Sequence, residues 1–307
     1  MIYILIVIII FFSLYITFFK SIEAYFHYIK GNNLLTEKKY DDSIREFLKC
    51  IELAPHYKQV YYLKGLAHYN LGNYLLALKD FKKALQDNPN DKIINLSIAN
   101  CFAKLFEYEK ALYIYDLVIN LDNSFSLAYY NKGLCLYEIG RYIEAIDNFS
   151  KSIELDKGYL PSYYSRALSY CELEKFQEAI DDFTIVATND PTYFQVYIDR
   201  GLAYYELKEL VKAYKDFDIA ITIQPNNPYP YFLRGNINFE VEDYFRAIND
   251  FNKCILLNPD YVEAYLYRGY CFEKYNDLEN CLEDWKIAAK LGSQEAKKNL
   301  EKYKNLK

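Results

Sequence analysis

Small, apolar and aromatic residues recur along the chain with a period of 34, in eight units that start at residues 24, 58, 92, 126, 160, 194, 228 and 262. Within a unit, positions 4, 7, 8 and 11 share one face of a first helix, and positions 17, 20, 24 and 27 share one face of a second. A period of this length indicates supersecondary units that stack on their neighbours. We therefore expect an all-α array over residues 24–295.

Three recurring positions predict how the two helices of a unit meet. Position 8 is glycine or alanine in every unit, position 20 is alanine, serine or cysteine, and position 24 is always aromatic. Small residues let the two backbones approach closely, and we expect the ring at position 24 to fill the space beside them. Proline occupies position 32 in five units and predicts the end of the second helix, because it removes an N–H donor and clashes with the preceding turn.

A cation at position 7 accompanies an anion at position 23 in most units. The unit from residue 92 has lost both and carries Ile98 and Ile114 instead. Because a partly buried cation needs a partner, we predict ion pairs between the two helices of one unit, and not an anion-binding site. The predicted pairs are Lys64 with Asp80, Arg166 with Asp182, Arg200 with Asp216, Arg234 with Asp250, and Arg268 with Asp284.

Residues 2–19 form an apolar run without a charged side chain. As a helix, the run would span about 27 Å, close to the ~30 Å hydrocarbon core of a bilayer. We expect a single-pass transmembrane anchor within residues 1–20, with a cleaved secretory signal as the alternative. Lys20 and Lys30 follow the run and no basic residue precedes it, which favours a cytoplasmic array over a periplasmic or exported one.

Charge and candidate chemistry narrow the function classes. A formal net charge of −6 gives no basic face, so we expect no nucleic-acid partner. The seven cysteines form no C-x-x-C pair and mostly occupy small-residue positions, which favours reduced structural thiols. The three histidines are scattered, and P-loop, dinucleotide-binding and nucleophile-elbow motifs are missing. We therefore expect no metal site, no cofactor and no enzymatic activity.

The small residues at positions 8, 20 and 27, the ring at 24 and the proline at 32 together resemble the tetratricopeptide repeat (TPR) over residues 24–295. The resemblance implies a right-handed α-solenoid of eight tandem helix pairs, whose first helices line a concave groove. Residues 296–307 continue the apolar spacing and are lysine-rich on the other face. We expect them to form the polar capping helix that such arrays need.

In the TPR family, positions 2, 5, 9, 12 and 13 of the first helix face the groove. The resemblance therefore implies a peptide groove of aromatic and amide side chains formed by Tyr62, Tyr69, Asn100, Tyr130, Tyr137, Tyr164, Tyr205, Phe232, Asn236 and Phe239. Such a wall suits an extended peptide or a helix. For any single ring, packing against the neighbouring repeat is the alternative.

Charge along the expected groove points to a basic partner. Chaperone-binding TPR proteins hold a C-terminal carboxylate with basic residues at positions 2, 5 and 6, and none of those positions is basic here. Position 13 instead carries Glu138, Glu172, Glu206 and Glu240, which favour a cationic ligand.

These observations predict a non-enzymatic, membrane-anchored scaffold that binds a protein or peptide in its concave groove. A self-assembling structural repeat protein is one alternative, and a regulatory subunit of a membrane enzyme complex is another.

Overall fold

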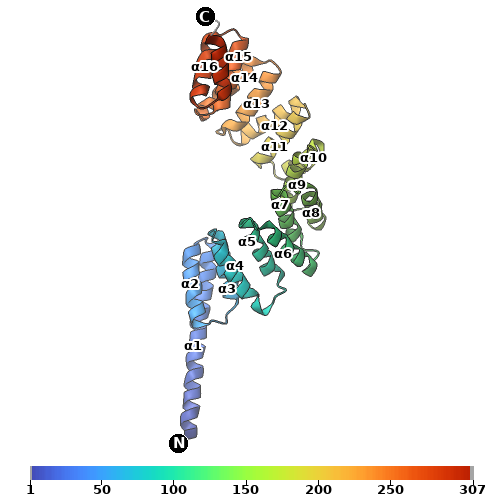
Figure 1. Ribbon diagram of the computed structural model, residues 1–307. Coiled ribbons are helices and arrows are strands. Elements are labelled where there is room, and N and C mark those ends of the chain that lie inside the picture. The colour runs from blue at the N-terminus through green and yellow to red at the C-terminus, as the bar shows by residue number, and fades with distance from the viewer. Residues whose placement is uncertain (1, 305–307) are drawn as a thin grey trace. The chain divides into compact units, whose positions relative to one another are not determined.

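The computed structural model describes residues 2–304, with the backbone alone described for residues 2–11, 13, 14, 16, 87 and 304. Over this range the chain is all-α, with helices in successive pairs (Figure 1). It divides into two compact units, Met1–Gly158 (unit 1) and Tyr159–Lys307 (unit 2). The prediction of paired helices is confirmed, whereas the handedness of the stack stays a prediction.

Unit 1 contains four helix pairs. Its elements are α1 (Ile2–Thr36), α2 (Tyr40–Leu53), α3 (Gln59–Asn70), α4 (Tyr74–Ala84) with the short 3-10 helix η1 (Leu85–Asp87), α5 (Lys92–Lys104), α6 (Tyr108–Leu121), α7 (Ser126–Glu138) and α8 (Tyr142–Leu155). Unit 2 contains four further pairs and a last helix. Its elements are α9 (Leu160–Glu172), α10 (Phe176–Asn189), α11 (Phe194–Glu206), α12 (Leu210–Ile223), α13 (Pro228–Glu240), α14 (Tyr244–Leu257), α15 (Val262–Lys274), α16 (Leu278–Lys290) and α17 (Gln294–Lys304).

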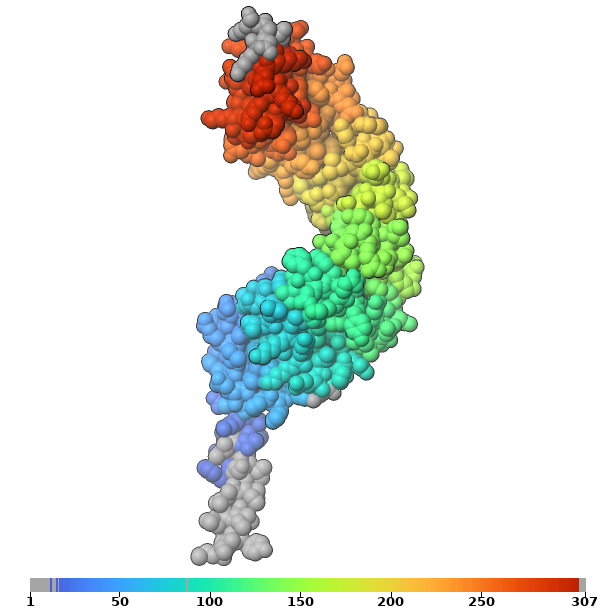
Figure 2. All heavy atoms as spheres, in the orientation of Figure 1, coloured from blue at the N-terminus to red at the C-terminus, as the bar shows by residue number. Residues whose placement is uncertain are grey.

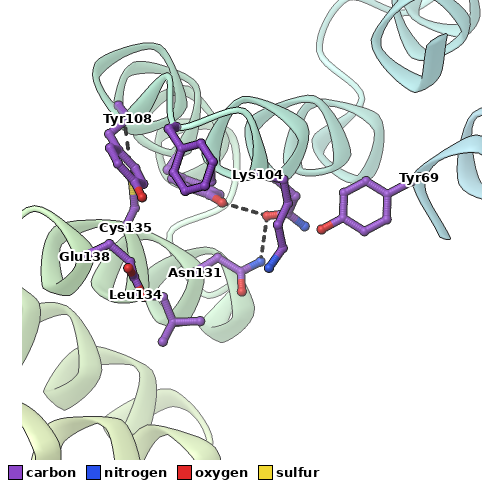
Figure 3. Close-up of a pocket in the computed structure, with 11 residues that line it drawn as sticks. Tyr69, Lys104, Tyr108, Asn131, Leu134, Cys135 and Glu138 are labelled. Atoms are coloured by element: carbon purple, nitrogen blue, oxygen red, sulfur yellow. Dashed lines mark hydrogen bonds between the residues drawn. The ribbon is translucent and has the colours of Figure 1, made fainter. Parts of the chain in front are cut away.

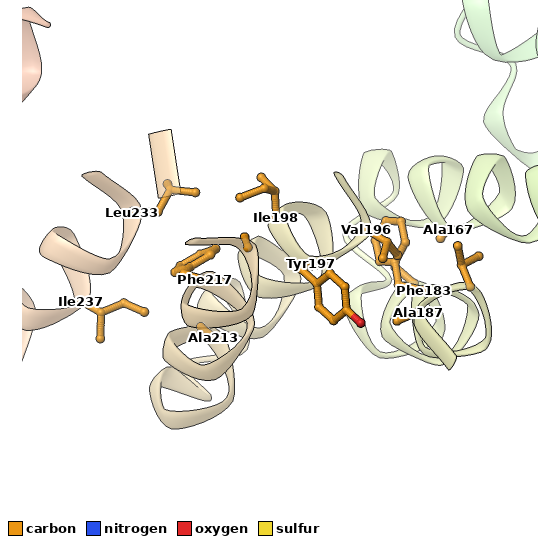
Figure 4. Close-up of a cluster of buried hydrophobic side chains, with 13 residues drawn as sticks. Ala167, Phe183, Ala187, Val196, Tyr197, Ile198, Ala213, Phe217, Leu233 and Ile237 are labelled. Atoms are coloured by element: carbon orange, nitrogen blue, oxygen red, sulfur yellow. The ribbon is translucent and has the colours of Figure 1, made fainter. Parts of the chain in front are cut away.

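Close contact between position 8 and the ring at position 24 holds each pair together. The ring at position 24 is at most 2% exposed in all eight repeats. A Cβ atom added to Gly201 would lie 2.5 Å from a ring carbon of Phe217, and the other position-8 glycines are similarly close to their rings. In these six repeats the ring occupies the space that a Cβ atom would take, and this close contact offsets the cost of glycine to the helix of about 1 kcal/mol. Figure 4 shows the resulting core around Phe183 and Phe217 in unit 2.

The turn between the two helices of a repeat has a left-handed residue at position 15. Gly72 and Gly140 have positive φ there, and non-glycine residues have φ between 55° and 63° at the same position in the other six repeats, namely Lys38, Phe106, Glu174, Lys208, Glu242 and Asn276. Only the two glycines carry the usual signature of such a turn. Sequence reasoning missed this feature.

Successive repeats are joined through position 4. Tyr197 donates a hydrogen bond from Oη to the carbonyl oxygen of Pro191, and Tyr61 and Tyr231 make the same bond to Pro55 and Pro225. The proline at position 32 therefore both follows the helix end and offers an acceptor to the next repeat. In repeat 3 (residues 92–125), Asn95 takes the tyrosine's place and donates to the Pro89 carbonyl over 2.9 Å.

The cations at position 7 lie against the anions at position 23. Arg166 and Asp182 form a bidentate pair at 2.7 Å, and the aspartate is 4% exposed. The other pairs are Lys64–Asp80 at 3.0 Å, Arg200–Asp216 at 2.7 Å, Arg234–Asp250 at 2.6 Å and Arg268–Asp284 at 2.6 Å. Burial raises the pKa of the Asp216 carboxyl, and the guanidinium of Arg200 opposes that rise. Such pairs fix geometry more than they add stability.

Arginines at position 7 also reach the preceding repeat. Arg234 Nη1 lies 2.5 Å from Oδ1 of Asp218, while Arg200 and Arg268 donate to Thr184 and Asn252. These acceptors all stand at position 25. Each of these guanidinium groups thus binds the aspartate of its own repeat and an acceptor in the preceding repeat. The sequence comparison of positions 7 and 23 did not predict the second contact.

The N-terminal helix α1 is continuous from Ile2 to Thr36, so the predicted anchor and the first helix of repeat 1 belong to one element. Among the described residues, no helix combines the length and the hydrophobicity needed to cross a bilayer. The anchor predicted at residues 2–19 falls mostly on side chains outside that description, so it stays a prediction. At the other end, α17 begins two residues before the predicted cap and packs Ala296, Leu300 and Tyr303 on the core around Trp285. Figure 2 shows the last helices of unit 2, coloured red, packed against one another. Residues 305–307 lie outside the described range.

The seven cysteines are free thiols, and six of them are buried. Only Cys171 is partly exposed, as its position in the repeat predicted. Burial raises the pKa of the Cys101 and Cys171 thiols to about 12. These groups are protonated near neutral pH and serve as small apolar side chains.

Candidate functional site

A pocket of about 390 Å³ opens in unit 1 between α3, α5, α6 and α7 (Figure 3). Its wall combines rings and amides, with one residue of each charge sign at the rim. The residues that define it here are Tyr69, Asn100, Lys104, Tyr115, Asn131 and Glu138. Two of them, Tyr69 and Asn100, belong to the groove expected from the sequence.

Asn100 on α5 is the centre of the hydrogen bonding in this pocket. Its Oδ1 accepts a bond of 2.7 Å from Tyr115 Oη and one of 3.0 Å from Asn131 Nδ2. The three side chains come from α5, α6 and α7, so the network joins both helices of repeat 3 to the first helix of repeat 4. We call the whole pocket, with Asn100, Tyr115 and Asn131 at its centre, the amide pocket.

The amide pocket keeps hydrogen-bonding capacity for a ligand. An asparagine side chain offers two donors and an acceptor with two lone pairs. Within residues 2–304, no bond uses the Nδ2 donors of Asn100 or the Oδ1 acceptor of Asn131. A donor and an acceptor side by side match the C=O and N–H of an extended peptide backbone.

Repeat 3 builds this pocket because it departs from its neighbours at position 24. Tyr115 stands where the other seven repeats have Phe or Trp, and the ring is 2% exposed. Its hydroxyl therefore needs an internal partner, which Asn100 supplies. Burial raises the pKa of Tyr115 well above its usual value, so the phenol stays protonated and donates. In the same repeat, Ile98 and Ile114 replace the ion pair of position 7 and position 23.

An exposed ring stands at the edge of the amide pocket. Phe106 is 77% exposed and has a φ of 60°. The left-handed φ is common to position 15 of all eight repeats, and only this repeat has an aromatic ring there. Phe106 lines the pocket together with Tyr108, and their ring centroids are 6.1 Å apart. The two rings give the pocket an apolar lip.

The other groove residues predicted in unit 1 pack mainly inside their own repeats. Tyr62 and Tyr130 lie against the position-24 rings, with centroids 5.7 and 5.9 Å away. Tyr137 contacts Tyr142 in its own repeat at 5.4 Å. Each of the three is partly exposed. Tyr62 also lines a second, separate pocket next to Ile93 and Ile94.

In unit 2 the predicted residues make different kinds of contact. Phe232 and Phe239 contact the same ring, Tyr267, with centroids 6.0 and 5.7 Å away. The buried Oδ1 atom of Asn236 has no hydrogen-bond partner among the described residues. Tyr164 donates to Asp199 over 2.5 Å, and a hydrogen bond between Tyr205 and Glu240 lowers the pKa of that glutamate.

The predicted acidic residues remain at the surface. Glu138, Glu172, Glu206 and Glu240 are all exposed. Glu240 has a lysine close by, with Lys208 Nζ 3.3 Å from its Oε1. Over the described part of the chain, no group of three His, Cys, Asp or Glu side chains is placed to hold a metal ion. The groove residues and the glutamates together offer hydrogen-bonding groups, aromatic rings and negative charge, which suit the binding of a peptide.

Sequence reasoning missed Tyr115, Asn131, Phe106 and Asp199. Tyr115 was assigned to the core, although its hydroxyl distinguishes it from every other position-24 ring. Asn131 and Asp199 stand at position 6, which was considered only for basic residues. No sequence signal marks Phe106, because six different non-glycine residues have positive φ at its position.

Comparison with known proteins shows what the chain resembles. Four tetratricopeptide repeat family models match it, at residues 24–57 and 229–261, 59–91, 126–159, and 164–228, which together exceed half of the chain. Anaphase-promoting complex subunit 3 of Schizosaccharomyces pombe is 27% identical over 36% of this chain and 17% of its own length. The Hsp70-Hsp90 organising protein of Plasmodium falciparum is 26% identical over 33% of this chain and 18% of its own length. The chain thus spans less than a fifth of these relatives.

Solved structures with low identity show the same fold. The C-terminal part of a TPR repeat-containing protein from Cytophaga hutchinsonii has a TM-score of 0.68 at 22% identity, covering 78% of this chain and 99% of that one. YrrB, described as a TPR protein with an unusual peptide-binding site, has a TM-score of 0.54 at 24% identity, covering 60% and 95%. With the repeat register and the paired helices described above, these matches establish that the chain belongs to the tetratricopeptide repeat family.

Proposed function

We propose that this protein is a non-enzymatic scaffold that binds an extended segment of a partner protein along the first helices of its repeats. The observation that carries the proposal is the amide pocket, where Asn100 and Asn131 hold each other in place and keep a donor and an acceptor available. A peptide-binding site is part of the description of YrrB. That likeness supports the proposal.

The partner segment is basic in this proposal. Exposed glutamates follow the first helices at position 13, and the residues at positions 2, 5 and 6 carry no positive charge. A negative surface attracts cationic ligands and speeds their encounter with the protein. A segment with lysine or arginine and one or two apolar side chains would match both the charge and the aromatic lip at Phe106.

Peptide selection tests the proposal directly. The full chain in detergent micelles is screened against a displayed peptide library, and the selected peptides are measured by fluorescence polarisation. Asn131→Leu removes the amide at nearly constant size, and we expect it to weaken binding at least about tenfold, since each lost hydrogen bond to a buried group costs about 1–3 kcal/mol. Asn120→Leu, on the exposed side of α6, is the control and should bind like the wild type. Equal binding by all three proteins would refute the proposal.

Membrane attachment through residues 2–19 is a further part of this proposal. It rests on the uncharged apolar run and on the lysines that follow it, which favour a cytoplasmic array. The full chain should resist extraction of membranes by alkaline carbonate, and a variant without residues 1–20 should be released. Protease added to sealed cells or vesicles should spare a cytoplasmic array. Release of the full chain would rule out the anchor, and digestion from outside would favour the exported orientation.

The polar cap argues against end-to-end self-assembly as the main function. Lys297, Lys298 and Lys302 on α17 are exposed while its other face covers Trp285. Capping repeats of this kind limit stacking. Light scattering of the full chain in micelles should give one mass at all concentrations. Growth of the mass with concentration would favour the self-assembly alternative.

A further inference from the structure

Asp199 on α11 is a partly buried carboxylate whose partners are neutral. Tyr164 Oη, from α9, donates to its Oδ2 over 2.5 Å, and Gln195 Nε2 donates to its Oδ1 over 3.0 Å. In the described part of the chain, no lysine, arginine or histidine nitrogen lies within 4.0 Å of it. The neighbouring Asp216 in the same repeat shows the contrast, because Arg200 binds it through two nitrogens.

The missing counter-ion has an electrostatic consequence. Burial raises the pKa of Asp199, and the hydrogen bonds from Tyr164 and Gln195 only partly offset that rise. A buried carboxylate normally has a cation beside it or gains a proton, because isolated charge is costly away from water. An incoming cation would remove the cost, so this site is preorganised for a positive ligand.

Two further tyrosines lie near the pair of Tyr164 and Asp199. Tyr193, which precedes α11, lies 5.2 Å from Tyr164 between ring centroids. Tyr193 is 37% exposed, and Tyr229 on α13 is 38% exposed. Tyr229 is close enough for the charge of Asp199 to raise its pKa, in addition to the effect of burial. Rings beside a carboxylate bind organic cations through their electron-rich faces as well as through the charge.

We propose a subsite within unit 2, formed by Asp199, Tyr164, Tyr193 and Tyr229, that binds the cationic end of a lysine or arginine side chain of the partner protein. The carboxylate oxygens accept hydrogen bonds from the ammonium or guanidinium group, and the rings cover its alkyl chain. All four residues belong to unit 2. The subsite rests on the proposed function, because it names a feature of the partner that the scaffold binds.

A substitution that keeps shape and removes charge tests the subsite. Asp199→Asn retains an oxygen for the Tyr164 hydroxyl, so the fold should be kept, which the circular dichroism spectrum and melting temperature of the variant will verify. The probes are the selected peptides in matched versions with lysine, arginine or norleucine at each basic position. The wild type should prefer lysine or arginine over norleucine at one position by about tenfold or more, and Asp199→Asn should abolish that preference while binding the norleucine peptides unchanged.

The control variant is Asp181→Asn, an equal loss of charge on the exposed surface of α10. It should keep the full preference, which separates a local subsite from the general attraction of an acidic protein. Norleucine versions that bind the wild type as tightly as the basic ones would overturn the subsite alone, as would a preference retained in Asp199→Asn. If no peptide of either kind binds the wild type, the proposed function fails, and the subsite fails with it.

Discussion

Repeat 3 and repeat 6 (residues 194–227) solve the same packing problem with different chemistry. Repeat 6 joins its two helices with the buried pair Arg200–Asp216 and a phenylalanine at position 24, while repeat 3 uses Ile98 and Ile114 with Tyr115. Both have a close-packed core, so the ion pair is one of two adequate solutions. Only repeat 3, however, directs a core hydroxyl to the surface amide Asn100. The repeat that lacks both charges of positions 7 and 23 is thus also the repeat that forms the amide pocket.

Breaking one half of the ion pair should have the largest effect. Arg200→Ile leaves Asp216 buried without its cation, and such a loss costs about 3–5 kcal/mol. We expect faster hydrogen exchange throughout α11 and α12, measured by mass spectrometry on the full chain. The double variant Arg200→Ile/Asp216→Ile copies repeat 3 and should return exchange close to the wild-type rate. If the double variant is as unstable as the single one, the two solutions are not equivalent.

Filling the space at position 8 should have the next largest effect. Gly201→Val places side-chain atoms where the Phe217 ring lies, and overpacking of this kind costs about 1–3 kcal/mol. Repeat 3 already has alanine at this position, so Ala99→Gly is the matched change and should cost only about 1 kcal/mol of helix stability. Exchange rates of the two helices in each repeat report both effects. A harmless Gly201→Val would contradict the close contact.

Removing the distinguishing hydroxyl makes repeat 3 resemble its neighbours. Tyr115→Phe deletes the 2.7 Å bond to Asn100, and we expect a loss of about 1 kcal/mol in the stability of α5 and α6. Peptide affinity should fall as well, because Asn100 is no longer held in place. The reciprocal control is Phe149→Tyr in repeat 4. It adds a buried hydroxyl on α8, outside the amide pocket, so it should leave peptide affinity unchanged. If Tyr115→Phe binds the peptide as tightly as the wild type, the Tyr115 hydroxyl does not contribute to peptide binding.

Relieving the backbone at position 15 should have the smallest effect on stability. Phe106→Gly allows the left-handed conformation without strain, and we expect a gain of up to about 1 kcal/mol. Lys208→Gly has the same φ of 60° and should give a similar gain. The two differ in binding, since only Phe106 lines the amide pocket. Equal peptide affinity in both variants would show that Phe106 is not part of the binding surface.

The fold was largely predictable because the repeat constrains it eight times. Glycine at position 8, the ring at 24 and proline at 32 each have a steric reason, and the paired helices follow from them. The turn at position 15 was not predictable, because stacking imposes its conformation on residues as different as Phe106 and Lys208. The 34-residue period predicts which position of the repeat a residue occupies. It does not predict the backbone conformation at that position.

The candidate site was predictable only in part. Asn100 and Tyr69 were placed from the family pattern, and both line the pocket. Several rings in the predicted groove, such as Tyr62 and Tyr130, lie against their own core ring, so an aromatic residue at position 5 has a packing role as well. Asn131 and Asp199 depend on contacts between first helices of successive repeats, and a pattern read within one repeat does not report such contacts.

The most direct test of the central claim is the affinity of one selected basic peptide for two variants of the full chain, Arg200→Ile/Asp216→Ile and Asn131→Leu. If the ion pair is a packing device and the amide pocket is the binding site, the first variant should bind within about twofold of the wild type. The second should bind about tenfold more weakly. Weak binding by the ion-pair variant together with wild-type binding by Asn131→Leu would contradict the account.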